Sequence, residues 1–365
     1  MTASAPVAPD IRPLVDAFLA DAIRLRASDI HVEPALAGYE IRFRIDGVLE
    51  TNRKLNSAQG RAAVGRLMVM AKLLTYRLDI PQEGRLSIPN NSEDHPDQAP
   101  IELRLSIMPT IHGLRAALRM PAEHIQPAVL EDLALPKNVV TGLTNFAAGD
   151  TGMMILTGPA GSGKTTTIYA LLRQILRINP GQSIIALEDP VERDLPGVTQ
   201  IEVSPFGQLT YEKALRSILR QDPQVLMLGE IRDAATASLA VQAALSGHRL
   251  ITALHAATPA GALARLLEMG IEPYQLTSSI HAIVAQRLIR RTSPGGYHGR
   301  VPLAEFVAMD APLKKAVMER ADSDALTKIY RSQSTHQTLY NVGQDLVEKG
   351  ITDEPELNRV IAAAK

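Results

Sequence analysis

The sequence predicts an α/β protein in which a smaller α+β domain precedes a larger domain with a mostly parallel sheet. Three observations predict it. The chain has 365 residues, which is too long for one compact core and fits two domains. Short strands and two helices fill its first third, whereas short apolar strands alternate with helices further on. That alternation is typical of a parallel sheet with helices on both faces.

Composition and charge exclude several classes of protein. The 38 Lys and Arg residues balance 39 Asp and Glu residues, so bulk binding to a polyanion is not indicated. The absence of cysteine excludes disulfides, thiolate zinc sites, iron–sulfur clusters and a cysteine nucleophile. Only 4% of residues are aromatic and none is Trp, so no base-stacking surface for nucleic acid is expected. Because no apolar run approaches the roughly 18 residues of a spanning helix and no export signal is recognisable, we expect a cytoplasmic protein.

Breaks in composition predict the domain boundaries. Residues 1–9 are small and rich in proline, which is typical of a disordered tail. A small α+β domain is then expected over residues 10–119. Three prolines within residues 120–136 indicate a linker. The larger α/β domain is expected over residues 137–365, with a mainly helical and charged segment from Ala311 onward.

Hydrophobic periodicity predicts the elements of each domain. Residues 39–45 alternate between apolar and charged side chains, as in a half-buried antiparallel strand, and Asp46–Gly47 supplies a hairpin turn. The other strands of the first domain are expected over 29–33, 48–51, 101–107 and 114–119, and its helices over 11–23 and 57–74. Polar residues and breakers over 89–100 indicate an exposed loop. In the larger domain the expected strands cover 153–157, 183–187, 225–228 and 250–254, and the expected helices cover 163–177, 211–221 and 234–246.

A phosphate-binding loop is the strongest functional signal. Gly158–Thr165 (GPAGSGKT) matches G-x-x-x-x-G-K-[ST] in full and stands between an expected strand and an expected helix. Glycines let backbone N–H groups turn toward phosphate oxygens, and the helix N-terminus adds its positive end. Lys164 is expected to reach the β- and γ-phosphates, and the Thr165 hydroxyl can ligate Mg²⁺. The sequence therefore predicts a site for a nucleoside triphosphate.

Such a loop also needs an acidic residue on a neighbouring strand, which handles the metal and the attacking water. Glu230 ends the apolar run VLMLGE, while Glu188, Asp189 and Glu192 follow another expected strand. Both groups can face the phosphates, because ligands gather beyond the carboxyl ends of the strands in such sheets. For Asp189 and Glu192 a structural role in a turn stays open beside a chemical one.

Two histidines and several arginines complete the candidates. His255 follows the strand expected over 250–254, at the edge where a γ-phosphate should lie, so it can donate a hydrogen bond to that phosphate or sense its loss. His248 precedes the same strand and is a weaker candidate. The two are not expected to bind a metal, because their side chains face opposite sides of the strand. The candidate arginines, among which spacing alone does not choose, are Arg85, Arg104, Arg216, Arg220 and Arg232.

These motifs together resemble the secretion ATPase superfamily, the hexameric motors of type II secretion and type IV pilus assembly. Ala27–Pro34 (ASDIHVEP) and Ile41–Leu49 (IRFRIDGVL) are similar to the start of the family's N-terminal domain. The segments similar to its Walker A segment, Asp box, Walker B block and His box are, in that order, Gly158–Thr167, Leu187–Glu192, Ala214–Asp233 and Gly247–His255. Ala285–Arg291 (AQRLIRR) resembles the helix that follows the His box.

The resemblance implies a RecA-like P-loop ATPase domain, a PAS-like N-terminal domain, and ATP with Mg²⁺ as ligands. It implies Glu230 as the general base, Glu188 as the group that holds the Mg²⁺-bound water, and His255 beside the γ-phosphate. The implied nucleotide-binding residues are Gly158, Pro159, Ala160, Gly161, Ser162, Gly163, Lys164, Thr165 and Thr166, of which Thr165 also serves the metal. It implies that two arginines of the N-terminal domain, Arg85 and Arg104, reach the nucleotide from beside the site. It also implies that Arg232 and Arg265 support catalysis or subunit contacts.

The resemblance also implies partners. A homohexamer would pass its motion to an inner-membrane platform protein, which would make the chain peripheral to the inner membrane. The sequence is similar to a short form of the family, because Arg291–Arg300 (RTSPGGYHGR) is a Pro/Gly turn in place of a four-cysteine zinc module. No zinc and no further N-terminal domain are therefore expected. Leu114 and Ala160 stand where the family tends to have Glu and Thr.

Three alternatives stay open: a pilus-retraction motor, a nucleic-acid translocase of related fold, and a ring scaffold that does not hydrolyse ATP. The segment ASDIHVEP favours the assembly branch over retraction. Low aromatic content and balanced charge argue against a nucleic-acid partner. A scaffold that does not hydrolyse ATP is disfavoured because the residues expected for hydrolysis are all present, namely Lys164, Thr165, Glu188 and Glu230.

Overall fold

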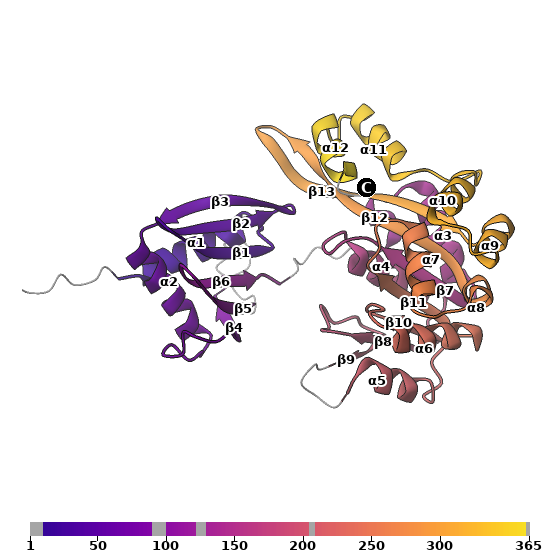
Figure 1. Cartoon of the computed structure of the whole chain (residues 1–365), viewed down its shortest axis with the longest axis horizontal. Coiled ribbons are helices and arrows are strands. Elements are labelled where there is room, and N and C mark those ends of the chain that lie inside the picture. The colour runs from indigo at the N-terminus through magenta and orange to yellow at the C-terminus, as the bar shows by residue number, and fades with distance from the viewer. Residues whose placement is uncertain (1–9, 90–99, 122–128, 204–208, 363–365) are drawn as a thin grey trace, which may run out of the picture. The chain divides into compact units, whose positions relative to one another are not determined.

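The computed structural model describes residues 10–89, 100–121, 129–203 and 209–362. The chain divides into two compact units, Met1–His124 and Ile125–Lys365 (Figure 1). The tail expected over residues 1–9 and most of the loop expected over 89–100 lie outside the described residues.

The first unit is an antiparallel sheet of six strands with two helices. The strand order is β3-β2-β1-β6-β5-β4. The helices are α1 (Arg12–Arg24) and α2 (Ser57–Met70), and the strands are β1 (Asp29–Ala35), β2 (Gly38–Ile45), β3 (Val48–Leu55), β4 (Gln82–Ile88), β5 (Ile101–Thr110) and β6 (Gly113–Arg119). The Asp46–Gly47 hairpin turn is confirmed, with positive φ at both residues. Strand β4 has no counterpart among the expected elements.

The core of the first unit lies between one face of this sheet and the two helices. Phe18 of α1, Leu67 of α2 and Ile41 of β2 are fully buried in it. Helix α2 begins at a capping box, in which the Asn56 side chain accepts from the Gln59 backbone and the Gln59 side chain accepts in return. Because successive residues of a strand face opposite sides, the other face of the sheet carries the charged side chains.

The second unit is built on a seven-stranded sheet of order β13-β12-β7-β11-β10-β8-β9. All neighbours pair in parallel except β12 and β13. The strands are β7 (Gly152–Thr157), β8 (Ile184–Glu188), β9 (Thr199–Glu202), β10 (Val225–Leu228), β11 (Arg249–Leu254), β12 (Ile280–Ser293) and β13 (Gly296–Ala308). The predicted mostly parallel sheet is confirmed.

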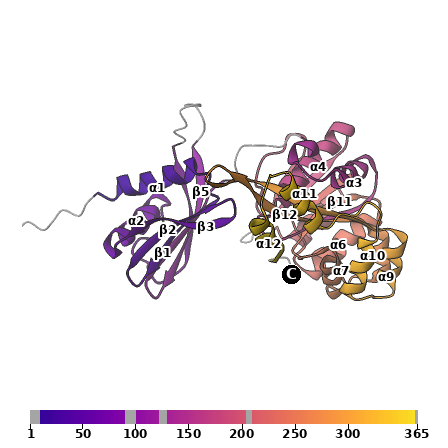
Figure 2. The same ribbon diagram turned by 90° about the horizontal axis from the view of Figure 1, so that it is seen from above.

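Helices cover both faces of this sheet (Figures 1 and 2). On one face α3 (Lys137–Ala148) and α4 (Lys164–Ile178) pack on alternate strand residues, including Met154 and Leu156. On the other face the helices pack on Met153 and Ile155; they are α5 (Tyr211–Ile218), α6 (Ala234–Leu245), α7 (Pro259–Glu268) and α8 (Pro273–Ser279). Strands β7, β8, β10 and β11 are therefore buried on both sides, which explains their continuous apolar runs.

Two segments differ from the expectations. The helix expected over Ala285–Arg291 is wrong, because this segment belongs to β12, which lies between β7 and β13. Burial on both sheet faces overrides the helix-forming tendency of its Gln, Arg and Leu residues. Within the expected linker over 120–136, the short 3₁₀ helix Leu130–Leu133 is formed, and Leu130 and Leu135 are buried in the core beside α3 and α4.

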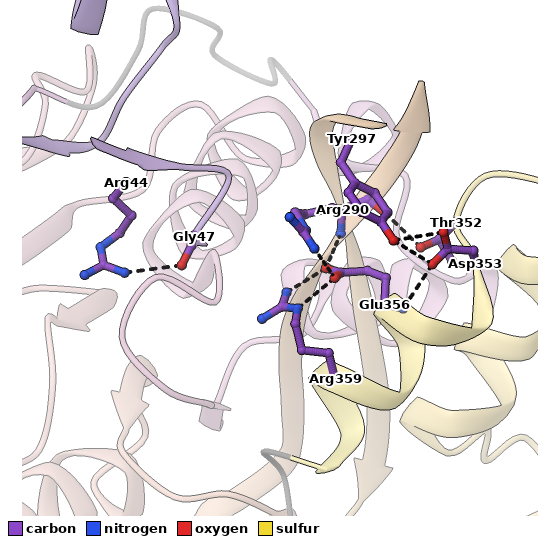
Figure 3. A network of polar contacts seen from close by, with 8 residues as sticks. All are labelled: Arg44, Gly47, Arg290, Tyr297, Thr352, Asp353, Glu356 and Arg359. Atoms are coloured by element: carbon purple, nitrogen blue, oxygen red, sulfur yellow. Dashed lines mark hydrogen bonds and ion pairs between the residues drawn. The ribbon is translucent and has the colours of Figure 1, made fainter. Parts of the chain in front are cut away.

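Four helices follow β13, as the sequence predicts for the segment from Ala311. They are α9 (Ala311–Met318), α10 (Ser323–Arg331), α11 (Leu339–Glu348) and α12 (Glu354–Ala362). Helix α12 is joined to the β12–β13 hairpin through Glu356, whose carboxylate accepts from Arg290 and Arg359 (Figure 3). Within the described ranges, no helix is both long and apolar enough to cross a bilayer.

Candidate functional site

The phosphate loop connects the carboxyl end of β7 to the N-terminus of α4, which is the context that the motif requires. Gly158, Gly161 and Gly163 have φ values of +151°, +73° and +86°. These conformations strain any residue with a Cβ. A Cβ on Gly161 would meet nothing within 4 Å, so the loop is open on that side.

Lys164 is turned back on its own loop. Its Nζ donates to the carbonyl oxygens of Gly158 and Pro159, at 2.8 Å each. Burial lowers the pKa of Lys164, and the negative charge of Glu230 opposes that shift. The ammonium group and the Glu230 carboxylate therefore influence one another, although they belong to two separate sequence motifs.

The loop fits an anionic ligand. The Ser162 hydroxyl is buried and has no hydrogen-bond partner within the part of the chain that the structure describes. The free N–H groups at the start of α4 add positive partial charge beside it. Thr165 is half-buried and Thr166 is exposed on the first turn of that helix. Phosphate oxygens can satisfy these donors, so the residues present suit the phosphate groups of a nucleotide.

Glu230 lies at the centre of a charged cluster beyond the carboxyl ends of β8, β10 and β11. Its Oε2 is 2.7 Å from Nε2 of His255, and its Oε1 accepts from Nε of Arg232. Arg232 also donates to Asp189 at 3.0 Å. Arg265 of α7 donates to the backbone carbonyl of His255 at 2.8 Å, which anchors the histidine loop.

Chain topology explains why these residues meet. Strands β8, β10 and β11 are parallel neighbours, so the segments that follow them emerge at the same edge of the sheet. The structure thus brings together Glu230, His255, Arg232 and Asp189, which the sequence places in three separate motifs. A carboxylate held between a histidine and an arginine can orient a water molecule and accept its proton.

Glu188 occupies a second, more buried cluster. It ends β8 with 3% of its surface exposed. Its Oε2 accepts from the Tyr169 hydroxyl at 2.5 Å and its Oε1 accepts from Nε2 of Gln200 at 2.9 Å. Burial raises the pKa of Glu188, while these two hydrogen bonds act in the opposite direction. Tyr169 belongs to α4, so Glu188 is tied to the helix that begins at the phosphate loop.

The two predicted arginines of the first unit lie in a row with a third that sequence reasoning missed. Arg85 of β4 pairs with Arg104 of β5, and Arg104 pairs with Arg119 of β6. All three are exposed, and no ion pair to them is formed by the described residues. Because directly opposed like charges repel, an anion bound beside this row of arginines would stabilise it. Arg119 could be found only from the pairing of β5 with β6, which the sequence alone does not give.

Three weaker candidates have local partners. His248 precedes β11, at the opposite edge of the sheet from the phosphate loop, and its Nδ1 lies 3.0 Å from the carbonyl oxygen of Ala243. Arg216 bonds Glu212 one turn away on α5, and Arg220 donates to the carbonyl of Arg216. Glu192 is exposed. None of these residues joins the Glu230 cluster.

Comparison with known proteins identifies the family of this chain. A profile of the type II/IV secretion system protein family matches residues 5–359. This chain belongs to that family. The putative type II secretion system protein E of Escherichia coli K12 is 36% identical, over 98% of this chain and 78% of the relative. The type II secretion system ATPase E of Vibrio cholerae is 35% identical, over 95% of this chain and 74% of the relative. The resemblance to the secretion ATPase superfamily is therefore confirmed.

Similar solved structures confirm the fold class. The Legionella pneumophila ATPase DotB superposes with a TM-score of 0.75 at 22% identity, covering 99% of this chain and 98% of DotB. The pilus retraction motor PilT, solved with ADP, superposes with a TM-score of 0.64 at 24% identity, covering 95% of this chain and 96% of PilT. At this level of identity the likeness establishes the fold, a RecA-like P-loop domain preceded by a smaller domain.

Proposed function

We propose that this family member is a motor ATPase that binds ATP with Mg²⁺ on Gly158–Thr165 and hydrolyses it with Glu230 as the base. One observation carries the proposal. The phosphate loop follows β7, and the Glu230 cluster lies beyond the carboxyl ends of neighbouring strands of the same sheet. The negative charge of Glu230 also opposes the lowering of the Lys164 pKa by burial. A phosphate binder and a water-orienting carboxylate are the two parts that P-loop hydrolysis needs.

In the reaction, Glu230 would take the proton of the attacking water while His255, its hydrogen-bonding partner, faces the γ-phosphate. Arg232 would keep the Glu230 carboxylate oriented through the hydrogen bond between them. Thr165 and Glu188 would hold Mg²⁺, Glu188 through a water molecule. Hydroxyl and carboxylate oxygens suit this ion, and Glu188 has acceptor capacity left beyond Tyr169 and Gln200. The bound ion supplies charge neutralisation at the β- and γ-phosphates.

Arg85 and Arg104 are proposed to contact nucleotide phosphates in the assembled protein. Their exposure and their lack of carboxylate partners within the described ranges support this role. A guanidinium group aimed at the γ-phosphate contributes roughly 10³–10⁵ in rate in other P-loop enzymes.

The biological role is proposed as the driving of type II secretion or type IV pilus assembly. A homohexamer at the cytoplasmic face of the inner membrane would act on a membrane platform protein. The names of the relatives at 34–36% identity, which are type II secretion system proteins, support assembly over retraction.

Phosphate release from ATP and Mg²⁺ by the full chain tests the proposal. The wild-type chain should release phosphate, and Lys164→Ala should lose essentially all turnover, because the charge at the β- and γ-phosphates is removed. Lys315→Ala, at an exposed lysine of α9, is the matched control and should keep wild-type turnover. Mass measurement at the assay concentration, with and without a non-hydrolysable ATP analogue, shows whether six chains assemble. No phosphate release by the assembled wild-type chain would refute the proposed activity.

A further inference from the structure

Strand β12 lies directly against the phosphate loop. Ala285 of β12 pairs with Thr157, the last residue of β7, so Gln286 and Gly158 are the next residues of the two strands. A Cβ on Gly158 would lie 2.4 Å from the backbone oxygen of Gln286. The two backbones therefore approach so closely that only glycine fits at position 158.

The Gln286 side chain reaches the far end of the same loop. It is buried, with 2% of the residue exposed, and its Nε2 donates to the carbonyl oxygen of Ser162 at 2.9 Å. Its Oε1 accepts from the Thr167 hydroxyl at 2.9 Å. A carbonyl can only accept, so the Ser162 contact fixes which end of the amide is nitrogen. A Cβ on Gly163 would lie 2.7 Å from that nitrogen, so a side chain at position 163 would displace the amide.

The hydrogen bond to Ser162 has a directional consequence for the next residue. The carbonyl of Ser162 and the N–H of Gly163 belong to one planar trans peptide, in which the two groups point in opposite directions. Since Gln286 holds the carbonyl on the β12 side, the N–H of Gly163 points to the other side of the loop. Gly163 is also the N-cap of α4, whose first N–H groups have no acceptor within the helix.

We propose that Gln286 is a positioning residue of the phosphate loop, which aims the N–H of Gly163 at the nucleotide by holding the Ser162 carbonyl. The inference rests on the proposed function, because it needs a phosphate group in the loop. Gln286 acts through the Ser162–Gly163 peptide and touches no phosphate. Its second hydrogen bond, to Thr167, joins the loop to the first turn of α4.

The test compares how strongly the full chain binds Mg–ADP and adenosine. Gln286→Met keeps nearly the same length and removes both hydrogen bonds. It should weaken Mg–ADP binding about tenfold or more, the effect expected for one misdirected hydrogen bond to a charged group. Adenosine affinity should stay unchanged, because adenosine has no phosphate for the loop to hold. Isothermal titration calorimetry measures both.

Two further variants separate aiming from general stability. Thr167→Val removes only the second hydrogen bond of Gln286, so Mg–ADP affinity should stay within about twofold of wild type, as expected when the Ser162 contact remains. Gln333→Met is the matched control, because the Gln333 amide bridges both backbone groups of Ala308, on β13. It should lower the melting temperature and leave Mg–ADP affinity unchanged.

Unchanged Mg–ADP affinity in Gln286→Met would overturn the inference, and so would equal losses for Mg–ADP and adenosine. If the methionine variant does not fold, Gln286→Leu is measured in its place with the same criteria. A wild-type chain that binds no Mg–ADP would refute the proposed function and this inference together. A wild-type chain that binds Mg–ADP, with a Gln286 variant that binds it equally well, would refute the inference alone.

Discussion

Two glutamates of the second unit are each held by two basic side chains, but they differ in what is left free. Glu356 is fully buried and accepts four hydrogen bonds, two from Arg290 and two from Arg359 (Figure 3). Glu230 has 18% of its side chain exposed, and its polar contacts within the described residues are with Arg232 and His255. A carboxylate offers about four acceptor sites. Glu356 is therefore saturated, whereas Glu230 keeps capacity for a water molecule.

The difference follows from where each residue stands in the fold. Glu356 fixes α12 to the β12–β13 hairpin, and the neighbouring Tyr297 hydroxyl donates to Asp353 at 2.8 Å. Glu230 follows a strand at the carboxyl edge of the parallel sheet, where ligands bind. A saturated carboxylate stabilises the fold, and a carboxylate with free acceptor sites is available for chemistry. Substitutions at the two glutamates should therefore change different quantities.

The largest expected effect is on turnover in Glu230→Gln. The amide cannot take a proton, so phosphate release should fall at least about a hundredfold, as is typical when a general base is removed. The free energy of unfolding should change by less than about 1 kcal/mol, because the site is partly exposed. The control Glu319→Gln, at the exposed residue that caps the C-terminus of α9, should keep both quantities. Normal turnover in Glu230→Gln would show that Glu230 is not the base and has a structural role, as Glu356 has.

The next largest effect is on stability in Glu356→Ala. Arg290 is left almost buried without its partner, and the free energy of unfolding should fall by about 2–3 kcal/mol. A fully buried pair would lose roughly 3–5 kcal/mol, but Arg359 is half-exposed. Urea unfolding measures the loss, and Glu354→Ala, at an exposed position of the same helix, is the control. ATP turnover per folded chain should remain; its loss would show that the cluster at α12 also serves the site.

The Glu356 cluster also predicts an acid limit to stability. Burial alone would raise the pKa of Glu356, but the hydrogen bonds from Arg359 and Arg290 outweigh it and lower the pKa to about 2. The unfolded chain then binds this proton more readily than the folded chain, so the contribution is complete above pH 4.5 and is lost as the pH falls toward 2. Glu356→Ala should lack this component of acid unfolding.

The last effect has the opposite sign and concerns Glu305 of β13. Burial raises the pKa of Glu305 to about 7, although the Leu339 N–H and the charges of Arg331 and Arg287 lower it. His336 faces it at 3.9 Å, and burial lowers the pKa of that imidazole. The folded chain holds the Glu305 proton more tightly than the unfolded chain, so stability should decline as the pH rises from about 4.5 to 7.

Glu305→Gln cannot titrate at this position and should remove that decline. Its free energy of unfolding, relative to wild type, should therefore increase from pH 5 to pH 7 and level off above pH 7. Urea unfolding at a series of pH values measures it, with Glu348→Gln, at an exposed residue of α11, as control. Parallel curves for Glu305→Gln and wild type would show that Glu305 is ionised throughout.

Local signals made much of the fold and site predictable, and long-range contacts account for the rest. Gly158–Thr165 and the acid after β10 could be found because glycine spacing and an apolar run that ends in Glu230 are sequence patterns. Gln286 could not, because it bonds Ser162, 124 positions earlier in the chain. The same distance effect explains β12, whose neighbours β7 and β13 decide that Ala285–Arg291 is a strand and not a helix.

The central claim is that Lys164 and its loop hold ATP while Glu230 activates water, and the nucleotide retained by Glu230→Gln tests it most directly. The variant and the wild-type chain are incubated with radiolabelled ATP and Mg²⁺ for the time of one wild-type turnover, and the bound nucleotide is then identified. The account predicts intact ATP on the variant and ADP on the wild-type chain. ADP formed on the variant at the wild-type rate would contradict it.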